Sequence, residues 1–142
     1  MIKISLTALT ARRIETLSVK NLDIGPIVID DVLHFGQISG DRQIIHNVGV
    51  DTIVPGNLII ARVPRWIQCC LNVETTLPVI TTGYNSIRFR TPLLVCDTLR
   101  FSWDVKAMRK MAMGILLRQH CVVRKQNDRV VASLDVNDLY YT

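Results

Sequence analysis

Asp41 and His46 are the two side chains whose types and spacing most clearly suggest chemistry. They lie in the segment FGQISGDRQIIHN, residues 35–47, just after a Ser-Gly pair. A carboxylate and an imidazole can together hold one water and move its protons. A five-residue spacing does not suit regular structure, because it separates side chains by about 140° around a helix and sends them to opposite faces of a strand. If the two residues act together, the backbone between them must bend.

Each of these residues also has an ordinary structural interpretation. Asp41 follows a glycine, and a carboxylate at that place often caps a turn. A single histidine is more often structural than catalytic. We expect the other two histidines, His34 and His120, to be structural because neither has a partner motif.

The segment before the Asp/His pair has the pattern of a helix. Asp30 or Asp31 can cap its start, and apolar residues recur at near-helical intervals from Val32 to Ile38. Gly40 stands where a helix usually ends with a left-handed residue. The residues that follow therefore form an irregular connection, which provides the bend.

A second and longer helix is predicted after Pro55, a residue that the first turn of a helix tolerates. Pro64 is a point at which this helix could bend or end, and we expect one helix of about four turns. Apolar residues recur at three- and four-residue steps along it: Leu58, Ile59, Val63, Trp66, Ile67, Cys70 and Leu71.

The second half of the chain has the pattern of β-strands. Apolar and polar residues alternate over four runs, residues 84–90, 98–108, 115–125 and 129–141. Gly114 and the polar residues 126–128 mark turns between them, which is typical of antiparallel hairpins. The predicted class is α+β, with a meander of about four long strands packed on one long apolar helix.

Length and composition favour one globular domain. The chain has 142 residues, 49% of them hydrophobic and 20% charged, with a net charge of +5. No apolar run approaches the roughly 20 residues of a membrane span, and the N-terminus has no signal-peptide pattern. No nucleic-acid-binding signature is present. We expect a cytoplasmic protein that binds neither membrane nor nucleic acid, in which a positive field attracts a phosphate-bearing small molecule or carrier.

The four cysteines, at positions 69, 70, 96 and 121, fit no zinc site. We expect them to be reduced and mostly buried, and we expect no metal or other cofactor.

Three motifs occur in order along the chain: FGQISGDRQIIH at residues 35–46, PGN at residues 55–57 and RFRTPLLVCDTL at residues 88–99. They resemble three motifs of the MaoC-like family of hot-dog-fold hydratases and dehydratases, which includes the (R)-specific enoyl-CoA hydratases. The family patterns are Tyr/Phe-x-x-Leu-Ser-Gly-Asp-x-Asn-Pro-x-His, His-Gly-Met and Arg-Phe-x-x-Pro-Val…Gly-Asp-Thr-Leu. The resemblance runs from about Leu22 to the C-terminus. Residues 1–142 are thus expected to form a single hot-dog domain, with residues 1–21 the less certain part.

The resemblance implies a long central helix wrapped by a curved antiparallel sheet, in a dimer built by pairing two sheets. It implies that Asp41 and His46 handle protons and a water at the β-carbon of an acyl thioester of coenzyme A or acyl carrier protein. It also implies that the Gly56 amide, with Asn57 beside it, binds the thioester carbonyl. The implied reaction interconverts 2-enoyl and 3-hydroxyacyl thioesters.

The chain departs from the family patterns at Gln43, Ile44, Pro55 and Cys96, which replace Asn, Pro, His and Gly. Two alternatives therefore stay open beside the hydratase or dehydratase. One is a thioesterase on the same scaffold, because fold does not fix function. The other is a dimeric module that binds an acyl chain without turning it over. The cations Arg62, Arg65, Lys106, Arg109 and Lys110 either form a solvated face or contact phosphates.

Overall fold

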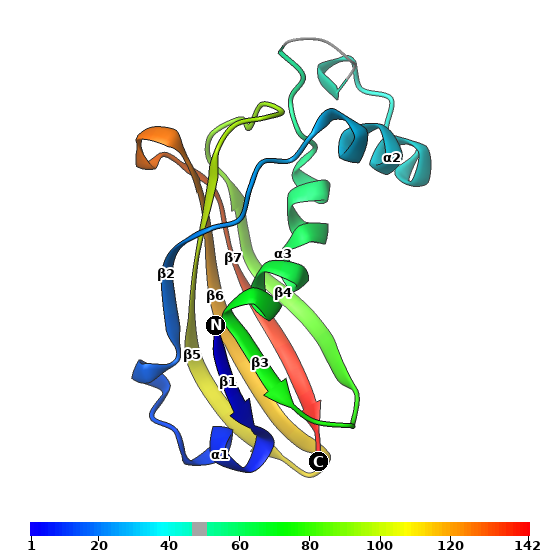
Figure 1. The fold of residues 1–142 in the computed structure, drawn as a ribbon. Coiled ribbons are helices and arrows are strands. Elements are labelled where there is room, and N and C mark those ends of the chain that lie inside the picture. The colour runs from blue at the N-terminus through cyan, green and yellow to red at the C-terminus, as the bar shows by residue number, and fades with distance from the viewer. Residues whose placement is uncertain (47–50) are drawn as a thin grey trace.

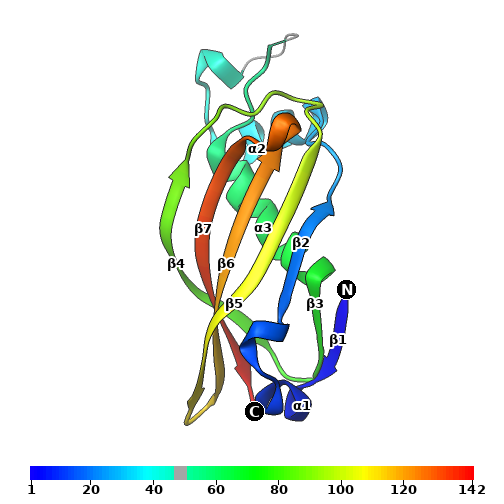
Figure 2. The ribbon, with the colours of Figure 1, turned by 90° about the vertical axis from the view of Figure 1, so that its left-hand side faces the viewer.

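The structure, a computed structural model, describes residues 1–46 and 51–142. A five-stranded antiparallel sheet curves around one long helix (Figures 1 and 2). The helices are α1 (Leu6–Ala11), α2 (Ile29–Ser39) and α3 (Gly56–Cys70), with short 3-10 turns at Ile14–Thr16, Ile44–His46 and Gln126–Asp128. The strands are β1 (Ile2–Ser5), β2 (Ser18–Asp23), β3 (Leu71–Glu74), β4 (Val79–Phe89), β5 (Leu99–Met111), β6 (Gly114–Lys125) and β7 (Val130–Tyr141). The predicted α+β hot-dog architecture is confirmed.

The strand order of the main sheet is β2-β5-β6-β7-β4. The four predicted strands are present as β4 to β7, but the predicted meander is wrong in one connection. β4 pairs with β7 at the edge of the sheet, whereas β5 pairs with β2 and β6. β1 and β3 form a separate two-stranded parallel sheet. These pairings join segments far apart in the chain, so local alternation could not reveal them.

The predicted long helix is present as α3, and Pro64 lies inside it without ending it. Its apolar stripe faces the sheet, where the Trp66 ring meets Phe101 with ring centroids 5.6 Å apart. Burial of each such large side chain contributes about 1.5–3 kcal/mol. The buried residues of the helix are Leu58, Ile59, Val63, Trp66, Ile67 and Cys70.

α2 ends as the sequence predicted, with Gly40 in the left-handed region at φ 72° and its N–H donating to Gly36 O at 2.9 Å. Its start differs slightly from the prediction, because the residue before the helix is Val28. Asp31 caps the helix from within the first turn, where a carboxylate oxygen accepts the Val28 N–H at 3.3 Å. Asp31 also forms an ion pair with Arg62 and so links α2 to α3.

A chain of hydrogen bonds satisfies the polar groups that the core encloses. The Trp103 indole donates to Gln119 Oε1 at 2.8 Å, and Gln119 Nε2 donates to Asp138 Oδ2 at 2.7 Å. Thr81 donates to the other Asp138 oxygen at 2.7 Å. Because each buried polar group here has a partner, the network ties β4, β5, β6 and β7 together without a large desolvation cost.

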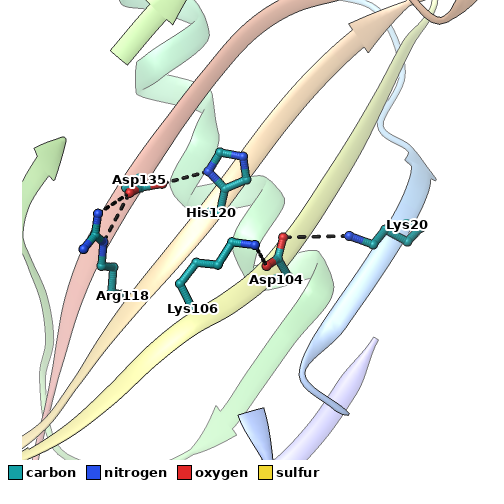
Figure 3. A network of polar contacts seen from close by, with 6 residues as sticks. All are labelled: Lys20, Asp104, Lys106, Arg118, His120 and Asp135. Carbon is teal, nitrogen blue, oxygen red and sulfur yellow. Dashed lines mark hydrogen bonds and ion pairs between the residues drawn. The ribbon is translucent and has the colours of Figure 1, made fainter. Parts of the chain in front are cut away.

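The face of the sheet away from α3 carries a second polar network (Figure 3). Asp104, His120 and Asp135 are cross-strand neighbours on β5, β6 and β7. His120 Nδ1 lies 2.7 Å from Asp135 Oδ1, and Arg118 donates twice to Asp135 Oδ2, at 2.8 and 3.2 Å. His120, which we expected to be structural, therefore has a carboxylate partner in this network that the sequence motifs did not indicate. Burial opposes ionisation of Asp135, but the bonds from His120 and Arg118 outweigh it and lower the pKa of this carboxyl.

The cysteine prediction is correct for two residues of four. Cys70 and Cys121 are buried, whereas Cys69 and Cys96 are exposed, and all four are free thiols. Burial is the main reason why the pKa of Cys70 rises to about 12.

None of the helices in the described ranges is long and apolar enough to cross a membrane.

We predict that Asp135→Asn lowers the free energy of unfolding at pH 7 by about 1–3 kcal/mol, because hydrogen bonds to a charged group are lost. A lowered pKa in the folded state means that the stabilisation is fully present above the unfolded pKa of about 3.9, declines below that pH, and is lost as pH falls through the folded-state pKa. Denaturant titrations at pH 7 and pH 3 should therefore show a difference between variant and parent that shrinks in acid. Asp128→Asn is the control, since its 71%-exposed carboxylate faces Arg124 at 3.8 Å and should contribute little. An equal deficit at both pH values would contradict this account.

Candidate active site

The segment between Asp41 and His46 bends through two local turns. The Asp41 N–H donates to Ser39 Oγ at 3.2 Å, and the Gln43 N–H donates to Asp41 Oδ1 at 3.0 Å. The second bond is an Asx-turn, in which the aspartate side chain mimics a backbone turn. The 3-10 turn Ile44–His46 follows, with the His46 N–H on Gln43 O at 3.0 Å. The structure thus contains the bend that the five-residue spacing requires.

The bend brings the carboxylate and the imidazole face to face. His46 Nε2 lies 3.7 Å from Asp41 Oδ2, and their side chains are 12% and 26% exposed. This distance is too long for a direct hydrogen bond and is of the kind that a water can bridge. The pair is thus arranged to share one water on the edge of solvent.

A backbone carbonyl fixes the orientation of the imidazole. His46 Nδ1 lies 2.7 Å from Ile53 O. A carbonyl oxygen can only accept a hydrogen bond, so Nδ1 carries the hydrogen. In the neutral ring, Nε2 then has a free lone pair, and this nitrogen is the one that faces Asp41. The arrangement presents a proton acceptor at Nε2.

The pair lies at the wall of a cavity of about 490 Å³, which is within the range of small-molecule sites. Gly56 and Asn57, the first residues of α3, line the same cavity. The first N–H groups of a helix have no acceptor within the helix and lie at the positive end of its dipole. The structure therefore brings all four residues singled out in the sequence to one cavity. The other lining residues are Gln43, Ile45, Ile53, Val54, Pro55, Ile59, Phe89, Arg90, Thr91, Pro92, Leu93 and Val131.

Of two other cavities, one is lined by Asp41 and His46 and one is not. One of about 530 Å³ lies beside α2 and shares Asp41, His46 and Pro55 with the first. Asp41 and His46 therefore line two neighbouring cavities. Another, of about 340 Å³, is lined by Arg62 and Arg65 but by neither residue of the pair. We place the candidate site in the 490 Å³ cavity because the pair lines it together with Gly56 and Asn57, the first residues of α3.

Phe89, at the end of β4, packs directly on Gly56. A Cβ atom added to Gly56 would lie 2.7 Å from the Phe89 Cζ atom, closer than real Cβ contacts. A side chain at position 56 would therefore need the Phe89 ring to shift. Phe89 is 51% exposed, so its ring borders solvent as well as the cavity. No pattern in the sequence indicates this contact, because it joins residues 33 positions apart.

The departures from the family patterns have separate structural consequences. Gln43 supports the bend through its backbone N–H, so this role does not depend on an asparagine side chain. The Ile44 side chain lies outside the described part of the structure. Pro55 is buried and directly precedes α3. Cys96 adopts φ 66°, a left-handed conformation that favours glycine.

The cations considered as phosphate contacts lie elsewhere. Arg62 pairs with Asp31 and Lys106 with Asp104, on different faces of the molecule. Among the described residues, Arg90 is the lysine or arginine that lines the candidate site; it stands within the third motif but was not among the cations expected to contact phosphates. As for metals, the described residues contain no group of three or more His, Cys, Asp or Glu side chains placed to hold an ion.

Solved structures with a similar fold give a consistent comparison. A monoamine oxidase regulatory protein from Archaeoglobus superposes with a TM-score of 0.69 at 16% identity, over 88% of this chain and 89% of that one. The (R)-hydratase PhaJ1 from Pseudomonas aeruginosa gives 0.66 at 21% identity, over 87% and 88%. The 3R-hydroxyacyl-ACP dehydratase complex HadBC from Mycobacterium tuberculosis gives 0.64 at 10% identity, over 87% and 95%.

These structural neighbours include MaoC-domain dehydratases and (R)-hydratases, and the chain shares their hot-dog fold. The fold expected from the three motifs is therefore confirmed. The sequence itself matches no protein-family model and no curated protein. At such low identities the likeness shows the fold alone.

We predict that Gly56→Ala lowers the free energy of unfolding by up to about 1 kcal/mol, because the added methyl group displaces the half-exposed Phe89 ring from its contact with Gly56. In a Phe89→Ala background the same change should be neutral or stabilising, since alanine favours a helix more than glycine does. A double-mutant cycle by chemical denaturation measures this coupling. Equal effects of Gly56→Ala in both backgrounds would show that the ring does not occupy this space.

Proposed function

We propose that this protein is a hydro-lyase that interconverts 2-enoyl and 3-hydroxyacyl thioesters of coenzyme A or acyl carrier protein. The observation that carries the proposal is the Asp41–His46 pair, 3.7 Å apart in a cavity that also contains the N-terminus of α3. The hydratases and dehydratases among the structural neighbours support it.

The pair supplies the proton chemistry. An ionised Asp41 and the Nε2 lone pair of His46 are both acceptors, so one water can donate to each and aim an oxygen lone pair at C3 of the enoyl group. As the C3–O bond forms, the pair takes a proton from the water. It then returns a proton to C2, so that the H and OH of one water are added across the double bond. The reverse sequence is dehydration.

The N-terminus of α3 supplies the charge stabilisation. Attack at C3 moves the π electrons through C2 to the thioester oxygen, which becomes an enolate. The N–H of Gly56 at the helix N-terminus is the group we assign to this oxygen, and Asn57 lies beside it in the cavity. Such a preorganised donor typically contributes about 10²–10³-fold to the rate. The reaction uses no metal and no redox cofactor in this mechanism.

Crotonyl-CoA is the substrate for the direct test, with loss of the conjugated enoyl absorbance as the signal. We expect turnover by the parent protein and a loss of at least about 10²-fold in kcat/KM for Asp41→Asn and for His46→Gln. Asp135→Asn is the matched control, because it removes a carboxylate that hydrogen-bonds a histidine on the opposite face of the sheet. Turnover that is the same in all three variants would contradict the assignment.

Two other outcomes would redirect the assignment. Release of free thiol, followed with a chromogenic thiol reagent, would identify a thioesterase. Saturable binding of the thioester with no turnover of either kind would identify an acyl-binding module.

We also propose that the protein is a homodimer joined along β4. This strand is an edge of the sheet and pairs only with β7 among the described strands. A long, exposed edge strand with apolar side chains is a natural template for pairing with another chain. Val79, Ile80, Tyr84 and Phe89 on β4 are all exposed, by 37–51%. The neighbouring structures include complexes of two hot-dog chains, which supports pairing of this kind.

We predict that Ile80→Lys combined with Tyr84→Lys converts a dimer to a monomer, because like charges would face each other across the paired strands. Light scattering after gel filtration measures the mass. Met113→Lys, which places the same charge at a 52%-exposed site in the β5–β6 turn, should leave the dimer intact. A parent protein that is already monomeric would overturn the homodimer and favour a different partner chain.

We further propose that residues 1–142 act as one domain that includes the N-terminal segment. Ile4, Leu9 and Leu17 are buried in the same core cluster as the residues of α3 and the main sheet.

A reducing compartment such as the cytoplasm fits the two exposed free thiols, Cys69 and Cys96.

A further inference from the structure

A nearly buried ion pair lies close to the candidate site without lining its cavity. Asp97 and Lys125 are each 11% exposed, and Lys125 Nζ lies 3.3 Å from Asp97 Oδ2. Neither side chain contributes to the cavity wall. The pair joins the loop before β5 to the end of β6, and nothing in the proposed reaction uses it directly.

The Asp97–Lys125 pair fixes the conformation of the loop formed by residues 92–97. Lys125 Nζ also donates to Pro92 O at 2.9 Å, and Asp97 Oδ2 accepts the Leu94 N–H at 3.0 Å. Gln126 donates to the other Asp97 oxygen at 2.7 Å. These bonds from Gln126, Leu94 and Lys125 outweigh the effect of burial and lower the pKa of Asp97. The carboxylate is therefore the centre at which the loop is fixed.

The clamped loop in turn holds the segment that precedes α3. The Val54 N–H donates to Leu93 O at 2.8 Å, and the Val95 N–H donates to Thr52 O at 3.1 Å. These bonds form an isolated antiparallel bridge between Ile53 and Leu94. The two short segments are thus paired on both sides of Ile53.

This pairing decides where the Ile53 peptide groups point. In an antiparallel pair, alternate residues direct their N–H and C=O groups to opposite sides. Because Thr52 and Val54 bond the loop, Ile53 directs its own groups the other way. Its N–H donates to Ile45 O at 2.9 Å, and its carbonyl meets His46 Nδ1 at 2.7 Å. The loop therefore controls the carbonyl that places the hydrogen on Nδ1.

We propose that Asp97, with Lys125, is a positioning residue for His46. It acts through the loop and the Ile53 carbonyl to hold the ring in the tautomer that leaves the Nε2 lone pair facing Asp41. The catalytic part of this inference rests on the proposed function, whereas the tautomer can be measured without any reaction.

The test is ¹⁵N NMR of histidine in the full-length protein, in which only three histidines give signals. His46→Gln assigns the His46 signals. In the parent, we expect the Nδ1–H tautomer at His46. In Asp97→Asn, we expect a mixture of the two tautomers and a loss of about 10–100-fold in kcat with little change in KM, since a small misplacement of a catalytic group has a cost of this order.

Asp135→Asn is the matched control, because Asp135 is also paired with a cation, is 12% exposed and contacts a different histidine, His120. It should change the His120 signals and leave those of His46 unchanged, although both variants lower stability. If Asp97→Asn does not fold, Gln126→Ala and Lys125→Met remove partners of the same carboxylate and should shift the His46 tautomer in the same direction.

A His46 tautomer that stays unchanged in the folded Asp97, Lys125 and Gln126 variants would overturn the inference, even if the protein proves to be a hydratase. A tautomer that shifts in a protein without hydratase activity would uphold the positioning role and overturn the proposed function instead.

Discussion

The apolar stripe of α3 has to be buried, and the curved sheet is the surface that buries it. The contact of Trp66 with Phe101 is one part of this packing. Once α3 is fixed along the sheet, its N-terminus lies at one end of the molecule, close to the loops that follow α2 and β4 (Figure 1). The Asp/His segment is held at the same place by the hydrogen bonds between Ile45, His46 and Ile53, and α2 is also linked to α3 through the Asp31–Arg62 ion pair. The site is therefore a consequence of how the core is packed.

Backbone groups, and not side chains, perform several of the functions that we assign to this site. The N–H of Gln43 supports the bend, the carbonyl of Ile53 orients His46, and the helix N-terminus at Gly56 is the group we assign to the enolate oxygen. Backbone functions of this kind tolerate changes of side chain. This is the physical reason why the segment can depart from the family pattern at Gln43 and still bring Asp41 and His46 together.

Local patterns were sufficient to predict α2 with its end at Gly40, the long apolar α3 and the four long strands. They could not predict the pairing of β4 with β7 or of β1 with β3, because these contacts depend on long-range packing. The same limit applies at the site. The spacing of Asp41 and His46 indicated a bend, but the Phe89 ring on Gly56 and the Leu93–Val95 ladder that supports Ile53 join distant residues. The exposure of Cys69 and Cys96 was also missed, because composition alone does not place a side chain.

The central claim is that one water between Asp41 and His46 adds to an enoyl thioester whose carbonyl oxygen is held at Gly56. A crystal structure of the His46→Gln variant with a bound enoyl thioester tests it most directly. The account predicts the carbonyl oxygen about 3 Å from the Gly56 nitrogen and C3 of the acyl group next to the Asp41 carboxylate. A thioester bound in the cavity beside Arg62 and Arg65, away from this pair, would contradict it.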